Sequence, residues 1–416
     1  MSLAAKELQA ADAANVVARQ AYGKLVAWLS YQWRDISAAE DAMSNAFIKA
    51  LEVWPVQGVP EKPEAWLLTV ARHELLQVAR RQRLHNSPQI QALLNEEAEY
   101  EAPETIPDSR LKLMFICAHP AIDASIRPAL MLQTVLGLDA QVIAQAMLMS
   151  PAAMAQRLVR AKNKIKQVNL RFEEPGLDEL PERLQAVLEA IYAAYGFGWD
   201  ALDGGEVQVQ GLRSEALYLA KVVCALLPHD PEAKGLLALM LFCEARIPAR
   251  FISQESGGFA FVPLSEQNTQ LWQADMIESA ETLLYEAAQA ARIGIFQLEA
   301  AIQSAHCQRM KNGQTPWRAI AMLYEMLISH SPSIGAGLAH ALAWGQCGEL
   351  EKANALLLSL ENAEFAKLTN HQPYWVAKAH LAKLSGDLFV HQQSLARAVG
   401  LSKSPAVRDY LSKQLV

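Results

Sequence analysis

Positive side chains in the segment 151–167 are the residues of this sequence best suited to a chemical task. The segment carries Arg157, Arg160, Lys162, Lys164 and Lys166, and it contains no Asp or Glu. The whole chain has a formal net charge of -7, so this positive charge is a local feature. Clustered Lys and Arg bind nucleic-acid phosphate. The segment therefore predicts a DNA-contacting element, and the alternative is a solvated basic helix.

The other residues of this segment indicate how those charges are positioned. Ser150 is a favourable N-cap and Pro151 fits the first turn, so we expect a helix to begin there. Its buried face is formed at helical spacing by Met154, Leu158, Ala161 and Ile165. With a preceding helix from Leu138, this gives a helix-turn-helix whose second helix fits the major groove. The side chains expected to face DNA are Gln156, Arg157, Arg160, Asn163 and Lys164.

A second basic helix is predicted to begin at Pro63, which suits a first helical turn. It ends in the cluster Arg80, Arg81 and Arg83. Arginines bind backbone phosphates, and an aromatic residue can stack on unpaired bases. The side chains expected to contact DNA are Trp66, Arg72, His73, Gln77, Arg80 and Arg81. Trp66 taken alone is more simply a core residue, so the helix matters as a second DNA-facing candidate on the same chain.

An amphipathic helix that starts near Ser37 is expected to precede the second basic helix. It should end at Pro55, because proline lacks the N–H donor and clashes with the preceding turn. Its polar face carries Glu40, Asp41, Ser44 and Asn45. Acids on an exposed helix usually only keep the surface hydrated, and the functional alternative is docking to a basic protein surface. The residues alone favour the first interpretation.

Composition limits the class of protein. A chain of 416 residues predicts two or three domains. Its five cysteines are scattered and never form a C-x-x-C pair, which is typical of reduced thiols inside a cell. The N-terminus lacks a signal-peptide layout, and no uncharged apolar run approaches the roughly 20 residues of a membrane span. We therefore expect a cytoplasmic, soluble protein with no membrane partner.

Catalytic and metal-binding patterns are missing from the sequence. It contains no phosphate loop, H-E-x-x-H, G-x-S-x-G or G-x-G-x-x-G. Cys117 and His119 are a weak metal pattern that a small buried pair explains better. Asp203 and Glu206 flank two glycines and read as a solvated turn. We expect neither an enzyme nor a cofactor.

Helical periodicity runs through almost every segment, and no convincing strand pattern interrupts it, so an all-α protein is predicted. Residues 87–109 form an acidic, proline-containing linker between helical units. Beyond Pro175 the helices come in pairs, and Gly348 and Gly386 occupy equivalent turns about 38 residues apart. This outline indicates a tetratricopeptide-like array, and an irregular helical bundle is the alternative.

The order of these parts resembles the extracytoplasmic function (ECF) sigma factors. The runs AAEDAMSNAF (38–47) and PEAWLLTVAR (63–72) resemble their region 2, and SPAAMAQRLVRAK (150–162) resembles the recognition helix of their region 4. Residues 115–120 and 180–188 are similar to a subgroup with a long C-terminal extension of tetratricopeptide type. The resemblance covers most of the chain and is closest through about residue 200.

The resemblance implies a division of the chain and a role for each part. Region 2 would span residues 8–86, the linker 87–109, region 4 110–170 and the extension 171–416. The region 2 face with Glu40, Asp41, Ser44 and Asn45 would bind core RNA polymerase. The second basic helix would hold the melted −10 promoter element, and region 4 would read the −35 element. The extension would regulate activity and bind a regulatory protein.

Some positions depart from the pattern of the relatives. Gln is usual in them where this chain has Ser44, and an acid where it has Asn45. An Asp is usual near Gln77. These departures leave polymerase affinity and promoter choice open. The alternative from another class is a helix-turn-helix regulator with a helical-repeat sensor, which would bind duplex DNA without polymerase.

Overall fold

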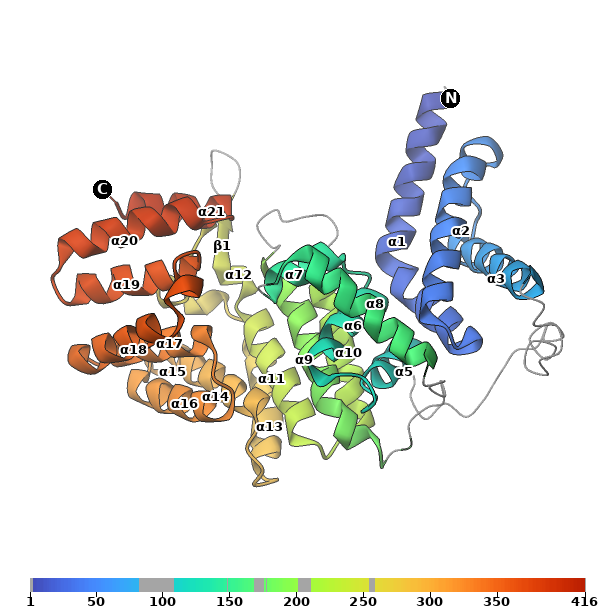
Figure 1. Cartoon of the computed structure of the whole chain (residues 1–416). Helices are drawn as coiled ribbons and strands as arrows, with labels where there is room; N and C mark the ends of the chain where they lie inside the picture. The colour runs from blue at the N-terminus through green and yellow to red at the C-terminus, as the bar shows by residue number, and fades with distance from the viewer. Residues whose placement is uncertain are drawn as a thin grey trace. The chain divides into compact units, whose positions relative to one another are not determined.

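The computed structural model describes residues 3–81, 108–147, 149–167, 176, 178–200, 211–253 and 259–415. Within these ranges nearly all regular structure is α-helical, which confirms the predicted fold class (Figure 1). The chain forms two compact units. The first comprises Met1–Trp199 with Glu206–Val222, and the second comprises Asp200–Gly205 with Val223–Val416.

Three helices form the N-terminal bundle: α1 (Leu3–Trp33), α2 (Ile36–Gln57) and α3 (Pro63–Arg81). A tight turn joins α1 to α2, with Arg34 in the left-handed region at φ 55°. Asp35 then caps α2 by accepting a hydrogen bond of 3.0 Å from the amide of Ala38. Met43 and Trp54 of α2 lie in the core of the bundle together with Leu67 of α3.

Helix α2 does not end at Pro55, as the sequence predicts, but continues to Gln57. Proline removes one backbone donor and disfavours the α conformation of the residue before it. Near the end of a helix this affects a single hydrogen bond, and the side chain of Pro55 is buried. The gain from burial in the last turn thus outweighs the lost bond, and the loop to α3 is correspondingly shorter than expected.

Three short helices, α5 (Ser109–Cys117), α6 (Arg127–Thr134) and α7 (Ala140–Ala146), with a 3₁₀ turn η1 (Ala124–Ile126), precede the longer helix α8 (Pro151–Gln167). Asp139 caps α7 through the amide of Gln141 at 2.6 Å. Ser150 caps α8 through the amide of Ala153 at 3.3 Å, as predicted. Because the four apolar residues expected on the inner face of α8 are all buried, α8 packs in the predicted orientation.

Two longer helices, α9 (Leu180–Asp200) and α10 (Leu212–Leu226), follow. Arg183 of α9 is buried and donates to the carbonyl of Phe115 in α5 at 3.3 Å. Arg110 of α5 forms an ion pair with Glu215 of α10 and lies 5.5 Å from the ring centroid of Tyr218. The start of the predicted extension therefore packs on the helix-turn-helix part within the first unit.

The second unit begins with α11 (Pro231–Ala245) and α12 (Ile247–Arg250), and continues through 3₁₀ turns η3 (Leu264–Glu266) and η4 (Thr269–Leu271) to α13 (Ala274–Ala288). A small hairpin of β1 (Phe251–Ser253) and β2 (Phe259–Phe261) pairs antiparallel, with Phe251 opposite Phe261. These strands are not predicted from the sequence. Each is three residues long, which is too short to show an alternating pattern.

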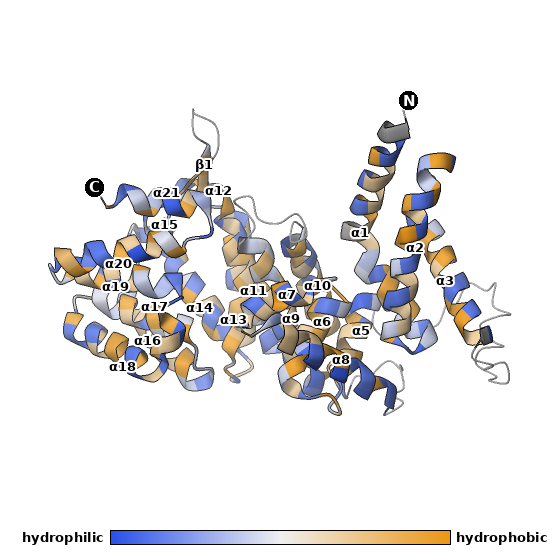
Figure 2. Ribbon diagram, turned by 45° about the horizontal axis from the view of Figure 1, so that its top comes forward, coloured by the Kyte–Doolittle hydropathy of each residue, from blue (hydrophilic) through white to orange (hydrophobic). Residues whose placement is uncertain are grey.

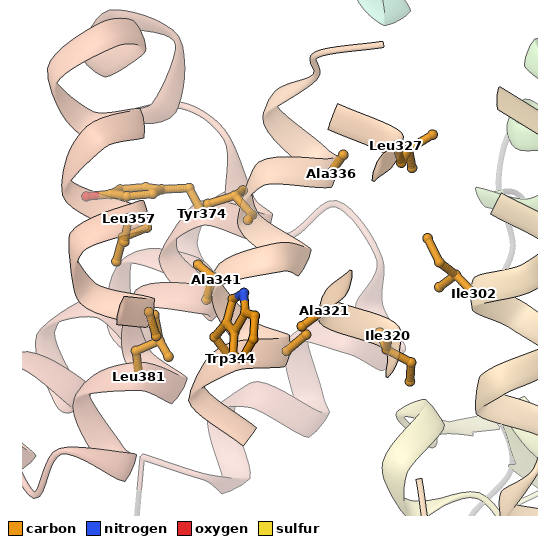
Figure 3. Packing of buried hydrophobic residues seen from close by; sticks show 14 of the residues in the cluster. Ile302, Ile320, Ala321, Leu327, Ala336, Ala341, Trp344, Leu357, Tyr374 and Leu381 are labelled. Carbon is orange, nitrogen blue, oxygen red and sulfur yellow. The ribbon is translucent and has the colours of Figure 1, made fainter. Parts of the chain in front are cut away.

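The remaining helices of the second unit are α14 (Ile295–Cys307), α15 (Arg309–Asn312), α16 (Trp317–His330), α17 (Ile334–Gln346), α18 (Leu350–Leu368), α19 (Gln372–Leu384), α20 (Leu388–Leu401) and α21 (Pro405–Lys413). Neighbours from α16 to α21 pack on one another in succession. Trp344 and Tyr374 lie in the apolar cluster shared by the helices from α14 to α19 (Figure 3). Gly348 and Gly386 have φ of 83° and 79°, so the two turns identified in the sequence have the same left-handed geometry.

Some predicted features lie outside the described residues. They are most of the acidic linker (residues 87–107), Arg83, and the turn with Asp203 and Glu206.

Candidate nucleic-acid interface

Helix α8 presents the polar face that the sequence predicts. Gln156, Arg160, Asn163 and Lys164 are exposed and Arg157 is half-buried. Figure 2 shows α8 as a largely hydrophilic helix. No acid interrupts this face, because the helix contains none. The face is suited to phosphate and base-edge contacts in a major groove.

Arg157 is less free than predicted. Its guanidinium donates to the Oγ of Ser125 and, at 3.4 Å, to the Sδ of Met149. The Ser125 hydroxyl in turn donates to Asp123, and this hydrogen bond holds the pKa of Asp123 below its usual value. No local pattern in the sequence indicates this network, since it joins residues 32 positions apart. These hydrogen bonds orient the guanidinium of Arg157 and leave its remaining N–H donors for a ligand.

The predicted DNA-contacting residues of α3 are only partly assembled into a surface. His73, Gln77 and Arg80 are exposed, and Arg72 lies over Trp28 at 5.8 Å from the ring centroid. Arg81 belongs to α3, but its side chain is outside the described residues.

Trp66 is half-buried against the core of the N-terminal bundle. Its ring meets that of Trp54 edge-on, with centroids 5.5 Å apart. This contact agrees with the interpretation of Trp66 as a core residue. The remaining exposed part of the ring lies at the start of α3, beside the loop from α2.

The polar face of α2 carries exposed Asp41, Ser44 and Asn45. Glu40 differs from them, because Lys162 of α8 donates to both of its carboxylate oxygens, at 2.8 and 2.6 Å. Burial raises the pKa of Glu40 above its usual value, and the neighbouring Lys162 opposes that shift. The sequence predicts Glu40 on an exposed helix face and does not predict this pair.

A groove of about 1150 Å³ lies beside this face, within the first unit. Glu40, Asp41 and Ser44 of α2 form one part of its wall, and Tyr22 of α1 and Gly137 before α7 form another. Ser214 and Glu215 at the start of α10 also line it. The groove is polar and carries several acids, which suits a basic partner surface better than an apolar ligand.

The thiols and histidines of the described residues do not form a metal centre. No group of three or more His, Cys, Asp or Glu side chains in these ranges could hold a metal ion. Burial raises the pKa of Cys117 to about 12, so its thiol stays protonated near neutral pH. The Nδ1 of His119 accepts a hydrogen bond of 3.0 Å from the amide of Ala121. This agrees with the interpretation of the pair as structural.

No helix within the described ranges has the length and apolar character needed to cross a membrane.

Comparison with known proteins assigns two parts of the chain. Residues 18–85 match the family Sigma-70 region 2, and residues 183–288 match a family of unknown function (DUF6596). Over 412 residues the chain is 33% identical to an uncharacterized protein of Rhizobium meliloti (strain 1021), covering 97% of this chain and 95% of the relative. No solved structure matches the chain.

The bundle of α1, α2 and α3 thus carries a Sigma-70 region 2 domain over residues 18–85, and this domain supports an RNA polymerase sigma factor. The chain belongs to the same family as its full-length relative from Rhizobium meliloti.

Proposed function

We propose that this protein is an alternative sigma factor of the ECF type that directs core RNA polymerase to specific promoters in the cytoplasm. One observation carries the proposal. A region 2 bundle and a helix-turn-helix with an acid-free, exposed basic helix lie in one compact unit of the same chain. Sigma activity is a binding function, so we propose no enzymatic step and no cofactor.

Region 2 would supply the polymerase contact. Asp41, Ser44 and Asn45 are exposed on one side of α2, and Glu40 lies next to them. Such a face fits a basic surface on polymerase, since complementary charge raises association rate and specificity. The adjacent helix α3, with Arg72, would hold the single strand of the melted −10 element by phosphate contacts.

Region 4 would supply duplex recognition. The exposed residues of α8 combine Arg160 and Lys164, which suit guanine edges and phosphates, with Gln156 and Asn163, which suit adenine edges. A helix with this set is able to read a −35 element in the major groove.

The helices after residue 175 would regulate these two regions. Successive helices from α16 to α21 pack on one another, with one apolar cluster from α14 to α19 and a second one that includes α20 and α21. We propose that this array is tetratricopeptide-like and binds a regulatory protein, as stacked helix pairs do with their extended surfaces. Within the first unit, the packing of α9 and α10 on α5 joins the start of the extension to the proposed region 4.

The experiment that tests the proposal compares promoter binding with and without core polymerase. Fluorescence anisotropy would use full-length protein and DNA from upstream of its own operon. We expect specific binding that depends on the polymerase. Specific binding to the duplex at equal affinity without polymerase would favour the helix-turn-helix regulator instead, and no binding under either condition would contradict both.

A further inference from the structure

Region 2 and region 4 of this chain approach each other closely at Gly23 of α1. A Cβ placed on Gly23 would overlap the backbone carbonyl of Val135, at the end of α6. Nearby, Tyr22 packs against Gly137, whose φ of 69° favours glycine. A glycine in the middle of a helix is less favourable than alanine. Here its small size permits the contact between the two regions.

Two ion pairs lie across the same contact and join α8 to α2. Lys162 pairs with Glu40 at 2.6 Å, and the two side chains retain only 12% and 19% of their exposure. Lys166 pairs with Asp35 at 2.9 Å and is mostly exposed. The first pair is therefore the stronger one, since salt and solvent screen exposed pairs heavily. Lys162 is thus directed away from the predicted DNA-facing residues and onto region 2.

Lys162 consequently covers one residue, Glu40, of the polymerase-binding face proposed for α2. Both carboxylate oxygens of Glu40 are bonded to Lys162, so a partner's cation can pair with Glu40 only after region 4 moves away. The exposed neighbours Asp41 and Ser44 line a groove that region 4 helps to enclose through Val135 and Gly137.

We infer that the free chain is closed by region 4 onto the polymerase-binding face of region 2, and that core polymerase competes with Lys162 for Glu40. This inference rests on the sigma function proposed above and adds its regulation. The closed form and polymerase binding exclude each other at Glu40. The apparent affinity for polymerase therefore equals the intrinsic affinity multiplied by the fraction of chains that are open. A signal that releases region 4 would raise polymerase binding with no change in the contact residues themselves.

Two kinds of substitution open the closed form from opposite sides. Lys162→Ala removes the partner of Glu40, and Lys162→Glu places a like charge beside it; neither alters region 2. Gly23→Ala removes no interaction, favours helix α1 by intrinsic propensity and blocks the approach of Val135. Loss of folding therefore does not explain a shared effect of these variants. Lys221→Ala is the matched control, because it removes one lysine charge at an exposed site of α10.

The test measures two quantities for each full-length protein: affinity for core polymerase without DNA, and radius of gyration in solution. We expect Lys162→Glu and Gly23→Ala to bind polymerase about three- to tenfold more tightly and to have a larger radius, with Lys162→Ala smaller in effect. Lys221→Ala should match the wild type. Unchanged affinity and radius in Lys162→Glu and Gly23→Ala would overturn the closed form, yet leave the sigma function standing if the wild type binds polymerase. A wild type that does not bind polymerase would instead remove the proposed function and this inference with it.

Discussion

Lys162 and Glu40 are 122 positions apart in the chain, and the Nζ of Lys162 donates to both carboxylate oxygens of Glu40. A hydrogen bond to a charged group contributes about 1.5–3 kcal/mol, and the two bonds here form one ammonium–carboxylate ion pair that counts once. The pair therefore stabilises the contact between α2 and α8. Because both side chains are mostly covered, this contribution should persist at physiological salt, unlike that of the exposed Lys166–Asp35 pair.

Arg160→Ala and Arg157→Ala should each weaken promoter discrimination in the presence of polymerase. A bidentate contact to a base is worth about 1–3 kcal/mol, so a five- to hundredfold loss of specific over nonspecific binding is expected. Competition binding with matched and mismatched −35 sequences gives this ratio.

Ser125→Ala separates the orientation of Arg157 from its charge, since Ser125 accepts from that guanidinium. A loss smaller than that of Arg157→Ala is expected, while a full-sized loss would mean that Ser125 itself contacts DNA. Equal binding by both arginine variants and the wild type would contradict the recognition role of α8.

Salt dependence gives a separate measure of the DNA contact. If region 4 makes about four phosphate contacts, the logarithm of the binding constant should fall with the logarithm of salt concentration at a slope of roughly −3 to −4. Titration of polymerase–promoter binding by wild type and by Lys164→Ala would show the slope decrease by about 1 in the variant. Identical slopes would exclude Lys164 from phosphate contact.

Gly348→Ala and Gly386→Ala should each destabilise the second unit by about 1 kcal/mol. Both glycines adopt left-handed φ, and no atom lies within 4 Å of a Cβ added at either, so the cost is conformational only. Chemical denaturation monitored by tryptophan fluorescence measures the difference.

Gly400→Ala is the control for these turns, because Gly400 lies in α20 with open space around it. That variant should be unchanged or more stable, by up to about 1 kcal/mol. Destabilisation at all three positions would show that the two turns have no special geometry.

His306 should make the second unit sensitive to acid. Burial, assisted by Arg246 and Arg309, lowers the pKa of His306 to about 3. The unfolded chain, with a pKa near 6.5, binds more protons between pH 6.5 and 3. This contribution to stability is therefore fully present above pH 6.5 and is lost as the pH falls, by about 2 kcal/mol at pH 5.

His306→Gln should remove this part of the pH dependence when unfolding free energies are compared at pH 7.5 and 5. His229→Gln, at an exposed site before α11, should keep the wild-type dependence. If the His306 variant loses as much stability in acid as the wild type, then the buried imidazole is not the source.

The helical fold could be predicted from sequence because its signals are local. The N-cap Ser150 and the buried positions Met154 and Leu158 define α8 within a single segment, and the structure agrees. The turn glycines Gly348 and Gly386 were likewise identified from their neighbours, and both have left-handed geometry. The prediction that α2 ends at Pro55 was wrong, because proline breaks a helix in its interior and has a weaker effect near the helix end.

The long-range contacts could not be predicted from the sequence. Nothing local to Glu40 indicates that Lys162 covers it, or that Ser125 fixes Arg157. The short strands at Phe251 and Phe261 were missed for a related reason, since pairing between the strands defines them and their own composition does not. Helical periodicity predicted the exposed face of α8. The exposure of Glu40 on α2 depends instead on Lys162, which is distant in the chain.

Run-off transcription with purified core RNA polymerase and full-length protein, on a template from upstream of the protein's own operon, tests whether this chain acts as a sigma factor. We expect a discrete transcript that requires the protein. Arg160→Ala should abolish or strongly reduce this transcript, and Gly23→Ala should increase it at limiting protein. If the polymerase makes no specific transcript with this protein and does not associate with it, the proposed sigma function is wrong.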